Sequence, residues 1–192
     1  EGGALIINNK KYIERAEIIR EKGTNRSNFL RGQIDKYSWV DIGSSYLPNE
    51  ITAAFLLSQL EQAEFITRKR LEIWDKYHNS FQFLEKSGAL KLPKIPRECL
   101  HNGHMYFLII ENFDKRNNFI SFMKERNIQC TFHYLPLHLS EIYQNNYLKN
   151  EKISLPKTED LSKRIVRLPF FLGIEAYQEY IIENIINFFQ KD

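Results

Sequence analysis

Residues 49–88, NEITAAFLLSQLEQAEFITRKRLEIWDKYHNSFQFLEKSG, determine how the chain is organised. Apolar side chains recur there every three or four positions between Ala53 and Leu84, which is typical of one face of an α-helix, and Asn49 is a suitable N-cap. The pattern predicts either one very long helix or two helices in succession. A single helix would extend roughly 50 Å, longer than a small domain is wide, and a helix of that length usually connects two domains.

Two prolines end the helical pattern, in Leu92-Pro93 and Ile95-Pro96, because proline cannot continue a helix. We therefore predict a domain boundary near residue 88. Residues 1–87 would form the end of a large domain together with the long helix, and residues 88–192 would form a small domain.

Four segments of the small domain have clear patterns and predict, in order, a strand, a helix, a strand and a closing helix. They are the apolar run 104–110, the segment that places Phe119, Phe122 and Met123 on one face, the alternating run 128–134, and the amphipathic run 175–190. This order is compatible with a small α+β or α/β domain.

The residues before the long helix are less regular. Ala4-Leu5-Ile6-Ile7 predicts a short buried strand, and the helix that follows should end at Gly23. Residues 22–48 show no periodicity but include four aromatic residues, so we favour a functional loop over a disordered linker. The chain opens with Glu1-Gly2-Gly3 and no initiator Met, which we interpret as a start in the middle of a strand.

The composition argues against several classes of protein. The 192 residues carry 27 Lys and Arg against 24 Asp and Glu, and 43% are hydrophobic, so a folded core is expected. The basic residues are scattered, which argues against a nucleic-acid partner. Cys99 and Cys130 have neither metal-site spacing nor the number needed for a disulfide framework, so we expect no metal site and a cytoplasmic location. No apolar run reaches the roughly 20 residues that span a bilayer, and no membrane partner is expected.

Two segments contain side chains that are suited to chemistry. In FHYLPLH, residues 132–138, strand alternation puts Phe132 and Tyr134 on the face of Ile128 and Cys130, and His133 on the other. Packed imidazoles and a functional cluster remain alternatives there. Ser44-Ser45-Tyr46 precedes a helix N-terminus, which suits either a bound anion or a simple cap and turn. His78 and His101 fall on a solvated helix face and in a loop, and we assign them no role.

Several blocks of this sequence, in this order, resemble the DegT-type sugar aminotransferases. They are EGGA at 1–4, EKGTNRSNFLRGQIDKYSWVDIGSSYLPNE at 21–50, FHYLPLH at 132–138 and RLPFF at 167–171. The block at 21–50 is the most specific, and the resemblance covers essentially the whole chain. Within the family the sequence most resembles the WecE type, the dTDP-4-amino-4,6-dideoxygalactose transaminases.

The resemblance implies the α/β fold of type I PLP-dependent aminotransferases, with this chain as the C-terminal part: the end of the large domain, a long linking helix and a small domain. The implied reaction moves an amino group from glutamate to the 4-keto carbon of dTDP-4-keto-6-deoxyglucose, for surface polysaccharide such as enterobacterial common antigen. The implied cofactor is pyridoxal 5'-phosphate (PLP).

The same resemblance places the Schiff-base lysine before the EGGA segment, upstream of Glu1, so no catalytic residue is expected within this chain. We predict that the 192 residues alone are inactive. The alternative is a non-catalytic remnant or partner chain that packs against a separate N-terminal half.

Active sites of the family form at a dimer interface, which implies a homodimer. The stretch 43–47 matches a GYNYR segment whose Asn reaches the cofactor phosphate of the neighbouring subunit; Ser45 takes the place of that Asn and Leu47 that of the Arg. The resemblance therefore nominates Ser44 and Ser45 for cofactor binding. For substrate binding it nominates two arginines of the long loop, as donors to the diphosphate, and three residues of FHYLPLH; these are Arg26, Arg31, His133, Tyr134 and His138.

Overall fold

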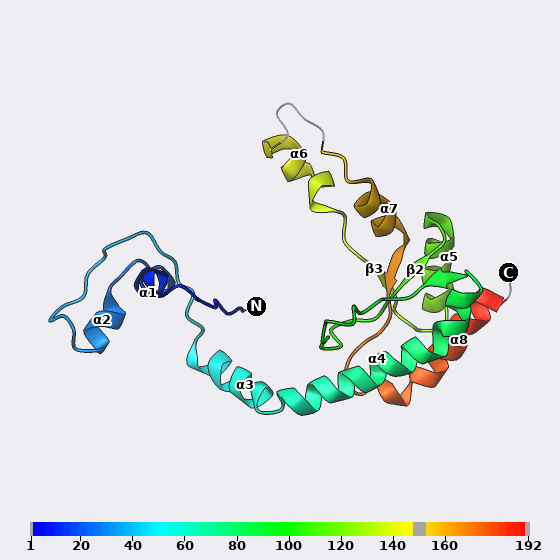
Figure 1. The fold of residues 1–192 in the computed structure, drawn as a ribbon, viewed down its shortest axis with the longest axis horizontal. Coiled ribbons are helices and arrows are strands. Elements are labelled where there is room, and N and C mark those ends of the chain that lie inside the picture. Colours follow the sequence, from blue (N-terminus) through cyan, green and yellow to red (C-terminus); the bar gives the residue numbers. More distant parts are fainter. Residues whose placement is uncertain (1, 148–152, 191–192) are drawn as a thin grey trace. The chain divides into compact units, whose positions relative to one another are not determined.

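The computed structural model describes residues 2–147 and 153–190 (Figure 1). The chain forms two compact units, Glu1–Gln62 and Ala63–Asp192. Their division falls between α3 (Glu50–Leu60) and α4 (Ala63–Lys86), so the long helical stretch is two helices in succession, one of the two predicted alternatives. The predicted boundary near residue 88 separates the large and small domains of the complete protein, and it stays a prediction.

The first unit contains little regular structure. Its elements are η1 (Lys10–Tyr12), α1 (Ile13–Arg20), α2 (Arg26–Leu30) and α3. The helix predicted to end at Gly23 is confirmed in α1, but the predicted buried strand at 4–7 is wrong: no strand forms, and Leu5 and Ile6 are 77% and 83% exposed. A strand needs a neighbour to supply its backbone hydrogen bonds, and the described residues offer none there.

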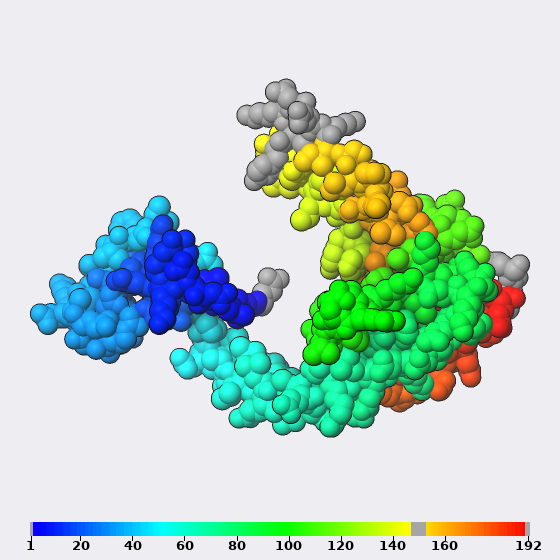
Figure 2. All heavy atoms as spheres, viewed as in Figure 1, coloured from blue at the N-terminus to red at the C-terminus, as the bar shows by residue number. Residues whose placement is uncertain are grey.

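Helix α3 is apolar, yet none of its residues is buried. Asn49 caps it as predicted, because its Oδ1 accepts a hydrogen bond from Thr52 N at 2.9 Å. Ile51, Phe55 and Leu60 are 85%, 69% and 59% exposed. The segment can be followed in cyan in the space-filling view (Figure 2).

Close backbone contacts organise the irregular loop of the first unit. Gly23 has φ +76°, and a Cβ there would lie 1.7 Å from the carbonyl oxygen of Asp41. A Cβ at Gly43 would lie 2.2 Å from the Gly23 nitrogen. Two bridges join the same segments, Glu21 with Ser45 and Thr24 with Trp39. Only glycine permits this approach, so both glycines fix the path of residues 39–45 against the end of α1.

The second unit is a four-stranded sheet with helices. Its elements are α4, β1 (Leu90–Lys91), β2 (Phe107–Ile110), α5 (Phe113–Lys124), β3 (Thr131–Phe132), η2 (Leu137–Leu139), α6 (Glu141–Tyr147), α7 (Pro156–Arg164), β4 (Ile165–Arg167), η3 (Ile174–Ala176) and α8 (Gln178–Gln190). The sheet order is β1-β2-β4-β3, and every pairing is antiparallel. The mixed α/β fold class is confirmed, and of the two open arrangements for the small domain the antiparallel sheet selects α+β. Among the described helices, none combines the length and apolar character that crossing a membrane requires.

One face of this sheet packs against α4, α5 and α8, which lie together in Figure 1. Leu108 and Ile110 of β2 and Val166 of β4 are fully buried on it. The predicted helix with Phe119, Phe122 and Met123 on one face is confirmed as α5, and the predicted closing helix within 175–190 is confirmed as α8. Both supply the opposite side of this core. Because side chains alternate along a strand, the residues between these core positions lie on the other face.

The predicted core face of residues 128–134 is only partly correct. Ile128 and Cys130 are buried, each 5% exposed, but Phe132 and Tyr134 are 59% and 78% exposed. Of residues 128–134, only Thr131 and Phe132 pair with another strand, as β3 at the edge of the sheet. After β3 the chain leaves the sheet toward Pro136. Residues beyond an edge strand have no layer of helices to cover them.

Replacement of a core aromatic residue should reveal this packing in the second unit. Phe119 is fully buried and its ring lies 5.2 Å from Phe188 and 5.7 Å from Phe189. We expect Phe119→Ala to lower the free energy of unfolding by about 3–5 kcal/mol. The control Phe113→Ala, at a side chain 48% exposed on the same helix, should change it by about 1 kcal/mol or less. Urea unfolding measures both, and equal losses would contradict the assigned core.

Candidate functional site

The residues nominated from the sequence divide between the two units. Four lie in the first unit and three in the second: Arg26, Arg31, Ser44 and Ser45, then His133, Tyr134 and His138.

Ser44 and Ser45 present their hydroxyl groups to solvent on a fixed backbone. The Ser44 amide donates to Ile19 O at 2.9 Å, and its carbonyl accepts from Lys22 N at 3.1 Å. Both side chains are exposed, and within the described residues neither hydroxyl makes a hydrogen bond. Two such donors on a fixed loop are suited to an anion such as a phosphate group.

The two arginines of the loop differ in how many donors they leave free. Arg26 donates to the buried Glu21 carboxylate at 2.8 Å and remains 48% exposed. Arg31 donates to both oxygens of Glu17, at 2.9 and 2.7 Å, and also to Asn28 and Gln33. The hydrogen bond from Arg31 lowers the pKa of the Glu17 carboxyl. Arg31 therefore stabilises the loop, whereas Arg26 keeps most of its N–H groups available.

In the second unit, His133 and Arg167 lie close together and both lack partners. His133 Nδ1 and Arg167 Nε are buried and make no hydrogen bond within the described residues. Burial first, and the positive charge of Arg167 second, lower the pKa of His133. The imidazole is therefore neutral at pH 7, with one nitrogen able to donate and one able to accept.

The other two residues of FHYLPLH have different surroundings. Tyr134 is exposed, with its ring centre 6.0 Å from that of His133. His138 is buried, and its Nε2 lies 3.1 Å from Glu159 Oε1 on α7. The Leu155 amide first, and His138 second, lower the pKa of Glu159. His138 thus joins η2 to α7, and Tyr134 is the residue that presents its side chain to solvent.

The sequence reasoning missed a pocket of about 950 Å³ beside these residues. Among the described residues, its lining includes Arg70, Arg126 and Arg167 and several aromatic residues but no acidic residue. Arg70 donates to Gly103 O at 2.8 Å and Arg126 to Phe122 O at 2.8 Å. One signal was available: Arg167 falls between Val166 and Leu168, which alternation assigns to the core, so the arginine had to lie on the open face.

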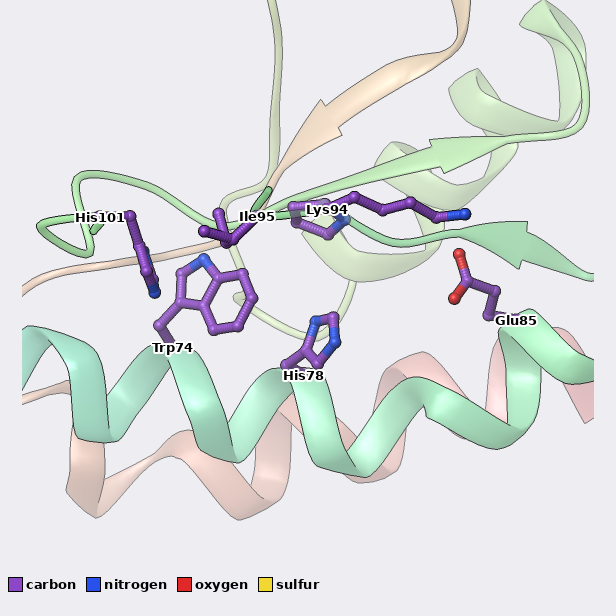
Figure 3. Close-up of a pocket in the computed structure, with 7 residues that line it drawn as sticks. Trp74, His78, Glu85, Lys94, Ile95 and His101 are labelled. Carbon is purple, nitrogen blue, oxygen red and sulfur yellow. The ribbon is translucent and has the colours of Figure 1, made fainter. Parts of the chain in front are cut away.

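A second pocket, of about 620 Å³, is lined by His78 and His101. His101 lies in a loop, as predicted, whereas His78, predicted on a solvated helix face, is half-buried. Figure 3 shows Trp74 between them, with Ile95 on the facing loop. The Trp74 ring lies 4.6 Å from each imidazole, stacked on His78 and edge-on to His101. Trp74 and His78 are four residues apart on α4, a spacing that places them on one helix face and was readable from the sequence.

Comparison with known proteins supplies the family context. A model described as the DegT/DnrJ/EryC1/StrS aminotransferase family matches residues 1–186. An uncharacterized protein of Methanocaldococcus jannaschii is 30% identical over 178 residues, which cover 89% of this chain and 45% of that protein. GDP-perosamine synthase of Escherichia coli is 29% identical, with 100% of this chain and 48% of that protein covered. UDP-4-amino-4,6-dideoxy-N-acetyl-beta-L-altrosamine transaminase of Helicobacter pylori is 26% identical, covering 100% and 49%.

Solved structures match the fold. The aminotransferase PseC of Helicobacter pylori has a TM-score of 0.80 at 21% identity, covering 96% of this chain and 48% of that one. TlmJ of Streptoalloteichus hindustanus has a TM-score of 0.78 at 20% identity, covering 96% and 46%. The chain spans about half the length of the curated relatives it matches. The predicted fold, part of a PLP-dependent aminotransferase, is confirmed.

The contact between His138 and Glu159 predicts a pH-dependent contribution to stability. The folded state lowers the pKa of Glu159, so the stabilisation is present above the ordinary carboxyl range and is lost as the pH falls through the lowered pKa. We expect Glu159→Gln to lower the melting temperature at pH 7 and to have little effect at a pH below the lowered pKa of Glu159, where the carboxyl is already protonated. Glu98→Gln, at an exposed loop residue, is the control and should have little effect at either pH. A pH-independent loss would contradict the role of the carboxylate.

Proposed function

The chain belongs to the DegT/DnrJ/EryC1/StrS aminotransferase family, and on this basis we propose that it supplies the C-terminal part of an enzyme that aminates a nucleotide-linked keto sugar. The family match over residues 1–186, which includes both units, is the observation that carries the proposal. Two relatives with named activities, GDP-perosamine synthase and the UDP-linked altrosamine transaminase, support a nucleotide sugar as the substrate class.

The finer proposal is a dTDP-4-keto-6-deoxyhexose as amino acceptor and glutamate as donor, in the synthesis of a surface polysaccharide of the enterobacterial common antigen type. It rests on the block at 21–50, which most resembles the dTDP-sugar enzymes of the family. The names of the two relatives refer to GDP- and UDP-linked sugars instead. The identity of the nucleotide is therefore the feature of this proposal that most needs an experiment.

The first unit fits one requirement of PLP, a place for its phosphate. Ser44 and Ser45 offer exposed hydroxyl groups without partners in the described residues, on a backbone held by Ile19 and Lys22. When bound, PLP supplies the electron sink that amino transfer needs. We propose that these two serines bind the cofactor phosphate and that the lysine which anchors the cofactor lies outside residues 1–192.

The remaining nominated residues would bind and orient the sugar nucleotide. Tyr134 presents an exposed hydroxyl, and His133 a neutral imidazole, to the substrate. His138 positions the segment through Glu159. Arg26 has free donors for the diphosphate. Arg31 already makes four hydrogen bonds, to Glu17, Asn28 and Gln33, and so contributes mainly by holding the loop in place.

We also propose that the working protein is a homodimer. The alternative function, a non-catalytic chain that packs against a separate N-terminal half, is favoured by the exposed apolar side chains of α3. Both proposals require a partner surface, and they differ in whether that partner brings the lysine.

Activity of the complete protein tests the proposed function. With PLP and glutamate, we expect 2-oxoglutarate to form on addition of dTDP-4-keto-6-deoxyglucose and much more slowly with the GDP- or UDP-linked keto sugars. The 192 residues alone should give no product, and an upstream half co-expressed with them should restore it. Faster reaction with GDP or UDP sugars would overturn the nucleotide choice, and no amino transfer to any of them would overturn the proposed function.

Cofactor affinity tests the role of the serines. In the complete protein we expect Ser45→Ala to weaken PLP binding by roughly tenfold, because a hydrogen bond to a charged group is lost. Absorbance of the bound cofactor between roughly 330 and 430 nm measures the affinity. Ser27→Ala, in α2 of the same unit, is the matched control and should bind PLP normally. Equal affinities for all three proteins would remove Ser45 from the site.

A further inference from the structure

We propose that Arg167, with His133 beside it, is the anion-binding centre of the 950 Å³ pocket and takes the carboxylate or phosphate group of a substrate. The inference rests on the proposed function for the identity of that substrate. The binding of an anion to this pocket can be tested without it.

The position of Arg167 in the sheet gives the first argument. On β4 it pairs with Phe107 of β2 on one side and with Thr131 of β3 on the other, so all three residues share the face that is opposite the helices. Its guanidinium therefore points away from the core while its Nε remains buried. This register fixes where the side chain leaves the sheet, and Arg167 is among the residues that line the pocket.

The missing acceptor gives the second argument. Within the part of the chain that the structure describes, Arg167 makes no ion pair and its buried Nε has no acceptor. Buried donors in folded proteins almost always have an acceptor, and a charged one without a partner is especially costly. An acceptor from a bound molecule would complete this site.

The other arginines of the pocket are different. Arg70 is bound to the carbonyl of Gly103 and lies 4.7 Å from the ring centre of Phe170. Arg126 is bound to the carbonyl of Phe122. Arg126 also lies 3.7 Å from the Glu125 carboxylate. Among the described residues that line the pocket there are three arginines and no carboxylate, so the lining is positively charged. Of these arginines, Arg167 is the one whose buried Nε has no acceptor in the described residues.

His133 strengthens the site because it lacks a partner at the same place. His133 directly follows Phe132, which pairs with Val166, and it lies close enough to Arg167 for the positive charge of that arginine to lower its pKa. Its buried Nδ1 has no partner in the described residues. Two neighbouring groups with unmet hydrogen-bonding capacity have one common explanation, an oxyanion that accepts from the guanidinium and contacts the imidazole.

A planar guanidinium fork recognises both carboxylate and phosphate oxygens. The proposed reaction offers one source of each: the carboxylates of the amino donor and the diphosphate of the nucleotide sugar. We propose the feature that both sources share, an oxyanion bound by the guanidinium, and kinetics of the complete protein distinguish the two sources.

Direct binding is the first experiment. In the 192-residue chain, the NMR signal of the Arg167 Nε–H should shift saturably when glutarate or inorganic phosphate is added, and exchange of that proton with water should slow. Arg167→Gln should abolish saturable binding, and Arg167→Lys, which keeps the charge but loses the fork, should weaken it. Arg97→Gln removes an exposed arginine that does not line the pocket; it is the control and should bind as the wild type. The absence of any saturable shift, or an equal loss in the Arg97 variant, would overturn the anion site.

Kinetics of the complete protein identify the source. We expect Arg167→Gln to raise the KM of one substrate by roughly 10- to 100-fold, as for a lost hydrogen bond to a charged group. A rise in the KM of glutamate assigns the site to the carboxylate, and a rise in that of the sugar nucleotide assigns it to the phosphate. Arg167→Lys should recover part of the loss, and unchanged KM values for both substrates would overturn the substrate role. If the protein transfers no amino group at all, the proposed function fails, while anion binding to the chain still stands or falls by the NMR experiment.

Discussion

The constraint on which the second unit depends is that, in the described residues, helices pack against one face of its antiparallel sheet. Leu108, Ile110 and Val166 are fully buried on that face, against α4, α5 and α8. Strand alternation then gives every intervening residue to the open face, where a charged side chain can remain without interrupting the core. Arg167 occupies such a position between Val166 and Leu168, both buried. The same alternation of side chains along β4 therefore buries Val166 and Leu168 in the core and places Arg167 at the candidate site.

Polar contacts over long sequence separations hold the walls of the pocket to this core. The Tyr77 hydroxyl, on α4, donates to Pro169 O at 3.1 Å. Arg70, about two turns earlier on the same helix, donates to Gly103 O at 2.8 Å. Gln178 at the start of α8 donates from Nε2 to Ile73 O at 2.7 Å, and both residues are buried. Because α4 is also the helix whose aromatic residues fill the core, movement of the pocket walls would require breaking buried hydrogen bonds as well as core packing.

How much of this could be predicted from the sequence depended on the range of the interactions. The helices were predictable because their signals, such as the spacing from Ile181 to Phe189 and the Asn49 cap, are local. The strands at 4–7 and 128–134 were overestimated because a strand needs a neighbour that the sequence does not identify, and Tyr134 was placed on a core face that ends at Cys130. His133 could be predicted as a site residue because it belongs to the FHYLPLH segment. Arg167 could be recognised as a site residue only from the strand register, which places it opposite Thr131. Trp74 shows the reverse case, since its spacing from His78 was visible but its contact with His101 was not.

Helix α3 connects the loop that carries Ser44 and Ser45 to the partner surface proposed to cover the apolar side chains of the helix. A helix of 11 residues is marginal in water on its own, and α3 buries none of its residues within the described chain. Ile51 and Phe55 would leave water in either the proposed dimer or a complex with a separate N-terminal half, and that burial would stabilise the helix. Its first turn is fixed by Asn49, four residues after Ser45, so a stable α3 also fixes one end of the loop that presents Ser44 and Ser45. The other end is already held by Gly23 and Gly43. The arrangement of the cofactor loop is therefore coupled to the partner surface, and formation of that surface should precede tight binding of the phosphate.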